Sequence, residues 1–170
     1  QRARLIERRG DRLVLDSEVQ TDLKAMQGAI TWARRQVATD PMAGVRATSR
    51  TLDRYAGHVL PGVDLPAVHN ARRGLIQTLT VLADDAAKVA VQLGEHRDAI
   101  ALLRKASLIE DRPERRVHLL RLLIATGRHL DARELADEFQ AEARRYQLPL
   151  DREVERIIAA IEATPAEHRS

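Results

Sequence analysis

The sequence predicts an all-α protein built from stacked pairs of antiparallel helices. Apolar side chains recur at spacings of three and four along most of the chain, which places them on one side of each helix. Aromatic residues make up only 2% of the sequence, and the apolar residues are mainly Ala, Leu, Val and Ile. This composition is typical of packed helices rather than sheets. A short pattern of turn residues also appears twice at one fixed displacement.

The repeated pattern indicates two equivalent corners. Its copies begin at Gly94 and Gly127, and in each copy a His follows two residues later, an Asp four later and an Ala five later. Each glycine stands where a helix must end, because a left-handed conformation costs Gly little. The displacement is close to the tetratricopeptide period of about 34 residues. We therefore predict a tetratricopeptide-like, right-handed helical repeat stack with a short N-terminal β-hairpin.

The residues after each glycine fit the start of a second helix. Asp98 and Asp131 can begin that helix, because an Asp oxygen can accept from the free amides of the first turn. Ala99 and Ala132 follow at once, and a small side chain there lets two antiparallel helices approach closely. Any helical hairpin can use Gly and Asp in this way, but agreement at four positions favours a true repeat.

The N-terminal segment carries the excess charge of the chain. Residues 1–12 hold five arginines and two acidic residues, which accounts for the whole net charge of +3. The rest of the chain is therefore balanced. A polyanion-binding surface over the whole domain is not supported, whereas a basic N-terminal element is.

Within this segment, residues 5–15 are typical of two short strands around a Gly-Asp turn. One interpretation is the wing of a winged-helix domain, in which Arg8, Arg9 and Arg12 lie along DNA phosphates. The other is a solvated hairpin with ordinary surface charge.

Two helices are predicted next. The first spans residues 21–39, where Leu and Ile recur at helical spacing. Asp40 can cap the second helix, and Pro41 is favoured in a first helical turn. We predict that this helix ends at Gly57. The two helices form a degenerate first repeat, in which Gly44 takes the place of the later alanines.

The middle of the chain contains its one long connection and its longest helix. The connection, residues 57–66, holds two prolines and two glycines but is rich in Val and Leu, so we expect it to pack against the helices. From Pro66 to Leu93 only Gly74 interrupts the helical pattern. At ~1.5 Å per residue this predicts a helix of about 42 Å that can brace both neighbouring hairpins.

Three helices and a closing helix follow. The first is predicted to end near Ile109, the second begins after Pro113, and the third covers 132–146. A break at residues 148–149 precedes Asp151, the predicted cap of a terminal helix that closes the exposed end of the stack.

Several motifs in this order carry a family resemblance. They are Tyr55-x-Gly57-x-x-Leu60-Pro61-Gly62, a long helix with Arg72 and Arg73, Gly94-x-x-x-Asp98-Ala99-Ile100-x-Leu102-Leu103, Leu119-Leu120-x-Leu122-Leu123-x-x-x-Gly127, and the cap Leu150-Asp151. The region 55–161 resembles the bacterial transcriptional activator domain that follows the DNA-binding module of antibiotic-regulatory-type activators. Residues 10–15 resemble the end of that module's wing. Ala67, where family members often have Trp, and Pro149 depart from the family pattern.

The resemblance implies a division into domains and a set of partners. Residues 1–16 would be the remnant hairpin of a winged-helix domain, residues 17–164 the activator domain and residues 165–170 a frayed tail. DNA would be read by an upstream domain that is absent from this chain. The chain itself would be a regulatory, protein-interaction or oligomerisation domain, with the transcription machinery or a second copy as its partner. The alternative is a freestanding helical-repeat scaffold.

A candidate partner-binding surface follows from the repeat register. The first helices of stacked hairpins line a concave face that can bind peptides or partner helices. Asp84, Lys88 and Gln92 are placed near that face by the first copy, and His118 and Arg121 by the second. For any single one of them, an ordinary solvated position is an equal alternative.

The sequence contains no motif that we interpret as catalytic, metal-binding or cofactor-binding. It has no cysteine, no phosphate-cradling Gly-rich loop, no Gly-x-Ser-x-Gly and no HExxH. His96 and His129 recur with the turn and are interpreted as surface residues. No apolar run approaches the roughly 18 residues of a membrane span, and no signal peptide is recognisable. We therefore expect a cytoplasmic protein that is neither an enzyme nor bound to a membrane.

Overall fold

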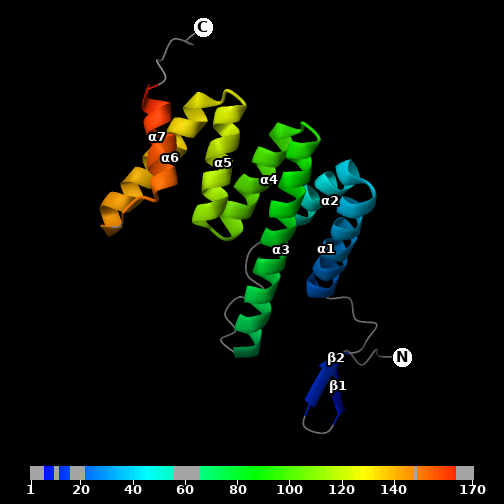
Figure 1. Cartoon of the computed structure of the whole chain (residues 1–170). Coiled ribbons are helices and arrows are strands. Elements are labelled where there is room, and N and C mark those ends of the chain that lie inside the picture. Colours follow the sequence, from blue (N-terminus) through cyan, green and yellow to red (C-terminus); the bar gives the residue numbers. More distant parts are fainter. Residues whose placement is uncertain (1–5, 10–11, 16–21, 56–65, 148, 164–170) are drawn as a thin grey trace.

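The computed structural model describes residues 6–9, 12–15, 22–55, 66–147 and 149–163, which form a two-stranded hairpin and seven helices (Figure 1). The helices are α1 (Asp22–Thr39), α2 (Pro41–Asp53), α3 (Pro66–Gln92), α4 (His96–Ile109), α5 (Pro113–Ala125), α6 (His129–Tyr146) and α7 (Arg152–Ala163). The all-α fold predicted from the apolar spacing is confirmed.

The helices form three successive pairs and a closing helix. The pairs are α1 with α2, α3 with α4, and α5 with α6, and each pair packs on the next through contacts such as α2 with α3 and α4 with α5. The closing helix α7 packs against α5 and α6. Figure 1 shows the pairs following one another along a curved stack from α1 to α7. This is the tetratricopeptide-like arrangement that the repeated turn predicted.

The hairpin consists of β1 (Ile6–Arg9) and β2 (Arg12–Leu15), which pair antiparallel. Its register places Ile6 opposite Leu15 and Arg9 opposite Arg12. The predicted strands are therefore present, while the Gly-Asp turn between them lies outside the described residues. Figure 1 draws the hairpin beyond the N-terminal end of α1, apart from the helical pairs.

The two predicted corners are equivalent in the structure. Gly94 and Gly127 both have positive φ angles, 78° and 72°. At each corner the residue after the glycine donates its N–H to the carbonyl five residues earlier, at 2.8 Å in both cases. The glycine N–H bonds the carbonyl three residues earlier, at 3.0 Å in both cases. These paired bonds close the helix end around a left-handed residue, for which Gly is the favoured choice.

The prediction that Asp98 and Asp131 begin the second helices is wrong. Those helices begin two residues earlier, at His96 and His129, and their capping residues make no side-chain cap hydrogen bond. The main-chain bonds at the corner satisfy carbonyls at the end of the preceding helix, and only one residue, Glu95 or Arg128, separates the glycine from the next helix. The two aspartates instead lie in the first turn, where a negative charge interacts favourably with the helix dipole.

The other two predicted caps are confirmed. Asp40 accepts a hydrogen bond from the N–H of Ala43 at 3.1 Å, with Pro41 in the first turn of α2. Asp151 accepts from the N–H of Glu153 at 2.7 Å at the start of α7. Helix α2 ends at Asp53, four residues before the predicted end. Most of the long connection, residues 56–65, lies outside the described residues, as does the tail after residue 163.

Small, buried residues occupy the same position in each pair. Gly44, Ala99 and Ala132 are the fourth residues of α2, α4 and α6, and all three are buried. A Cβ atom on Gly44 would lie 2.4 Å from the Cα and N atoms of Val37 in α1. The first pair therefore tolerates no side chain at this position, which explains why Gly44 replaces alanine there.

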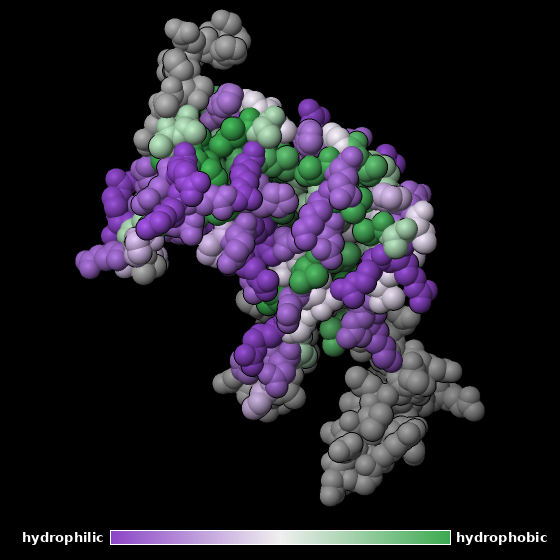
Figure 2. Space-filling view, in the orientation of Figure 1, coloured by the Kyte–Doolittle hydropathy of each residue, from purple (hydrophilic) through white to green (hydrophobic). Residues whose placement is uncertain are grey.

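Helix α3 forms the centre of the core. Four of its alanines, Ala83, Ala86, Ala87 and Ala90, have no exposed surface. Such small side chains let α3 lie close to its neighbours α1, α2 and α4. Figure 2 shows hydrophilic side chains over much of one face of the stack, with apolar side chains visible between them.

Candidate partner-binding face

A buried ion pair connects α3 to α5 beneath the predicted partner-binding face. The guanidinium of Arg115 donates from Nε to Asp84 Oδ1 at 2.7 Å and from Nη2 to Asp84 Oδ2 at 3.0 Å. The Arg115 side chain is 1% exposed and that of Asp84 is 28% exposed. A two-point contact of this kind fixes the relative position of the two helices more strictly than a single charge contact would.

The turn between α4 and α5 is tied into the same network. Arg115 Nη1 donates to the carbonyl oxygens of Glu110 and Ala106, and the Glu110 carboxylate accepts from Thr80 Oγ1 of α3 at 3.2 Å. Arg112 pairs with Glu110 at 2.7 Å. The buried guanidinium is therefore satisfied on every side, which removes most of the cost of burying its charge. Sequence reasoning did not single out Arg115, although its place one turn before the buried Leu119 indicated an inward-facing side chain.

Three of the predicted residues affect the pKa of a fourth, His118. His118 is partly buried on α5, and burial lowers the pKa of its imidazole, with Arg121 as the next cause. Lys88 acts in the same direction, while Asp84 opposes the shift. The Asp84–Arg115 ion pair holds these parts of α3 and α5 next to each other.

The cations of this surface have exposed partners. Arg121 forms an ion pair with Glu153 of α7, and the two side chains are 53% and 48% exposed. Lys88 lies 3.4 Å from Asp85, and both are also largely exposed. Such surface pairs contribute only about 0–1 kcal/mol, so an incoming partner can replace them at low cost. Gln92 is exposed at the last position of α3, one turn beyond Lys88.

The recurring histidines do not form part of this surface network. His96 and His129 are exposed at the first positions of α4 and α6. Among the described residues, no group of three or more His, Cys, Asp or Glu side chains is placed to hold a metal ion. In the same part of the chain, none of the helices has the length and apolar character needed to cross a membrane.

Stacked helical pairs of this kind define a helical-repeat domain. The family is shown by direct comparison: residues 21–161 match the model of the bacterial transcriptional activator domain, and the chain belongs to that family. No curated protein and no solved structure matches it. The chain is therefore a regulatory domain of the kind found in transcriptional activators.

Proposed function

We propose that the chain is the protein-interaction domain of a DNA-binding transcriptional regulator that acts in the cytoplasm. In this proposal a component of the transcription machinery binds to the face formed by α3 and α5. Lys88, Gln92, His118 and Arg121 contact the partner, while Asp84 holds Arg115 and so fixes the spacing of the two helices.

The observation that carries the proposal is the two-point ion pair between Asp84 of α3 and Arg115 of α5, which ties helices of two repeats together at this face. Exposed Lys88 and Gln92 on α3 and exposed Arg121 on α5 carry further polar groups of the two helices. Polar groups gathered from separate helices provide several contact points for one partner, and their surface pairs are weak enough to be exchanged.

The test uses the intact regulator with alanine at Lys88, Gln92, His118 and Arg121 together. Asp84 is left unchanged, because its loss would strand the buried Arg115. We expect normal DNA binding and at least a tenfold loss of regulated transcription from the target promoter in a purified system, about 1.4 kcal/mol. Full regulation by this variant contradicts the proposal.

A matched control separates this effect from a general loss of surface charge. Arg133, Asp137 and Arg144 are exposed on α6, away from α3. Replacing these three by alanine should leave regulated transcription unchanged. If the control loses as much activity as the first variant, the face formed by α3 and α5 has no special role.

A second part of the proposal concerns the hairpin. We propose that Arg8, Arg9 and Arg12 contact DNA phosphates and add affinity without selecting sequence. The isolated chain should then bind DNA weakly, non-specifically and with strong salt dependence. Alanine at all three positions should reduce the slope of log K against log salt by about 2.7. Tight, sequence-selective binding in a gel-shift assay would contradict this assignment.

A freestanding scaffold remains the second candidate, because a stack of this kind can join proteins without any DNA-binding module. The coding sequence before Gln1 separates the two. A helix-turn-helix segment there supports the regulator, and an unrelated signalling domain supports the scaffold.

A further inference from the structure

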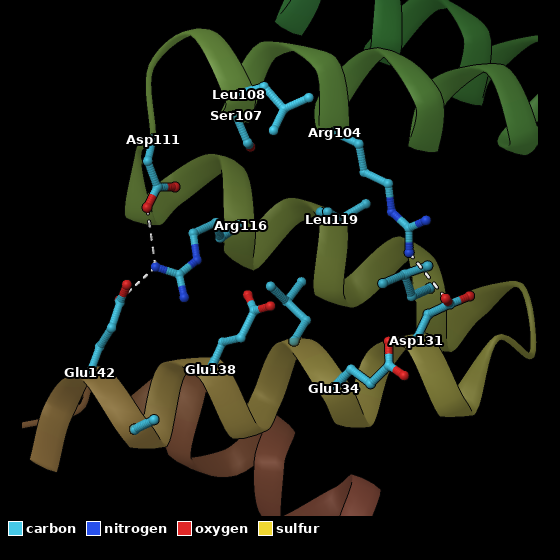
Figure 3. Close-up of a pocket in the computed structure, with 13 residues that line it drawn as sticks. Arg104, Ser107, Leu108, Asp111, Arg116, Leu119, Asp131, Glu134, Glu138 and Glu142 are labelled. Carbon is cyan, nitrogen blue, oxygen red and sulfur yellow. Dashed lines mark hydrogen bonds and ion pairs between the residues drawn. The ribbon is translucent and has the colours of Figure 1, made fainter.

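A groove lies between α4 and α6, with α5 as its floor (Figure 3). Its volume is about 800 Å³. It opens on a different side of α5 from the face described above. Residues two apart on a helix point about 200° apart, so Arg116 in the groove faces away from His118.

Ion pairs bound the groove at both ends. At one end Arg104 of α4 reaches Asp131 of α6 at 3.1 Å. At the other, Arg116 Nη1 bridges Glu142 of α6 at 2.6 Å and Asp111 at 3.3 Å. Figure 3 shows the two sets at opposite ends of the opening.

These end contacts are well anchored. The Arg116 guanidinium stacks 4.3 Å from the ring centre of Phe139, and its side chain is only 8% exposed. Burial alone would raise the pKa of Asp131, but hydrogen bonds from Arg104 and Arg128 outweigh it and lower that pKa. The buried Arg116 thus ties α6 to α5 at one end of the groove.

The interior of the groove is apolar and incompletely covered. Leu119 and Leu123 form its floor, and Leu135 lines the wall on α6. On the opposite lip Leu108 is 89% exposed, the largest value among the exposed large apolar side chains of the described residues. The neighbouring Ser107 hydroxyl is buried without a hydrogen-bond partner.

The lip on α6 is acidic. Glu134 and Glu138 line the groove one helical turn apart, and both are exposed. Within the described part of the chain, the side-chain carboxylates of Glu134 and Glu138 form no hydrogen bond or ion pair. Like charges at this spacing repel each other, and two cations spaced in the same way would relieve the repulsion.

We propose that this groove binds an amphipathic helix of a partner protein, with a leucine-rich stripe and two basic residues one turn apart. The stripe covers Leu108 and the leucine floor, and the basic residues pair with Glu134 and Glu138. From Asp131 to Glu142 the wall is about 16 Å long, enough for three helical turns. Charge complementarity selects a basic helix over an acidic one.

The probe is a fluorescently labelled 14-residue helical peptide with leucines at helical spacing and two flanking arginines at i and i+4. Its affinity for the full chain is measured by fluorescence anisotropy. A second peptide carries glutamate in place of both arginines. We expect the basic peptide to bind at least tenfold more tightly than the acidic one, with the difference shrinking at high salt.

Variants of the chain locate the binding. We expect two variants to bind the basic peptide about tenfold more weakly. One is the double variant Glu134→Gln with Glu138→Gln, and the other is Leu108→Ser. The matched controls are Asp137→Asn on α6 and Leu130→Ser, an exposed leucine that does not line the groove. Both controls should bind as the unchanged chain does. All variants alter exposed side chains, so the helical circular dichroism signal should be preserved.

Three outcomes overturn the proposal. The first is equal binding of the two peptides, and the second is binding that ignores the groove variants. The third is a lack of peptide binding together with dimerisation that Leu108→Ser abolishes, which would make the groove a contact between copies. The variant with alanine at Lys88, Gln92, His118 and Arg121 should bind the peptide normally. If the groove proposal fails, the proposed function of the face formed by α3 and α5 is therefore unaffected.

Discussion

The two ends of the stack are held together by different means. In α1–α4 the helices approach closely over small residues, such as Gly44 and the alanines of α3. In α5–α7, arginines connect helices to their neighbours, as in the pairs Arg116–Glu142 and Arg121–Glu153. Helix α2 packs directly on α4, whereas α4 and α6 face each other across the groove.

This difference shows how side-chain volume at helix contacts sets the shape of a repeat protein. Small residues let helix backbones approach, and that leaves no room for a ligand. Between α4 and α6, the long side chain of Arg104 reaches Asp131, and this ion pair spans the gap. The same repeat therefore gives a closed end and an open end, where we propose that a partner helix binds. Four substitutions test this difference between the two ends of the stack.

The largest effect is expected from Leu120→Asp. Leu120 is fully buried in α5, and a buried carboxylate without a partner costs about 4 kcal/mol or more. Because each repeat contacts only its neighbours, α5–α7 should lose structure while α1–α4 remains folded. Circular dichroism should show a partial loss of helix, while the fluorescence of Trp32, the single tryptophan, stays unchanged. A full, single-step loss of both signals would show that the two ends fold as one unit.

The second-largest loss of stability is expected from Arg115→Met. It leaves the Asp84 carboxylate and two main-chain carbonyls without their donor, and we expect a loss of about 2–4 kcal/mol in the free energy of unfolding. The matched variant Arg121→Met breaks an exposed pair and should cost below about 1 kcal/mol. Urea unfolding measures both. Equal losses would mean that burial of the Arg115 pair is unimportant.

Gly44→Ala should cost about 1–3 kcal/mol, because its Cβ would overlap the α1 backbone at Val37. The control is Gly28→Ala in α1, where a Cβ meets nothing within 4 Å. That change should stabilise the chain by about 0.5–1 kcal/mol, since Gly is a poor helix former. Thermal unfolding of both variants tests whether the close approach of α2 to the α1 backbone is the reason for Gly44. The same sign for both changes would contradict the explanation.

The smallest effect concerns pH. The pKa of His118 is lowered in the folded chain from its ordinary 6.5, so between these two values the unfolded chain binds more protons than the folded one. Stability should therefore fall as the pH drops below about 6.5 and level off beneath the folded pKa. His118→Gln should remove part of this dependence. His96→Gln, at an exposed corner, controls for the loss of any histidine, and identical pH profiles for all three chains would show that burial of His118 has no effect.

The sequence predicted helix ends correctly where one residue, a glycine or a capping Asp, sets the local conformation. Gly94 and Gly127 do form equivalent corners, and Asp40 and Asp151 do cap helices. The assignment failed at Asp98, because only Glu95 separates Gly94 from the next helix, which therefore begins at His96. The hairpin contacts and the partner-binding residues stay predictions.

The number, order and main boundaries of the helices follow from local sequence, because glycine conformation, capping and apolar spacing act between residues that are near in the chain. Long-range packing places Arg115 inward against Asp84 and Arg116 against Glu142. The same packing keeps α4 and α6 apart over an apolar floor. These features depend on distances between residues some 30 positions apart in the chain, which are fixed by how whole helices pack.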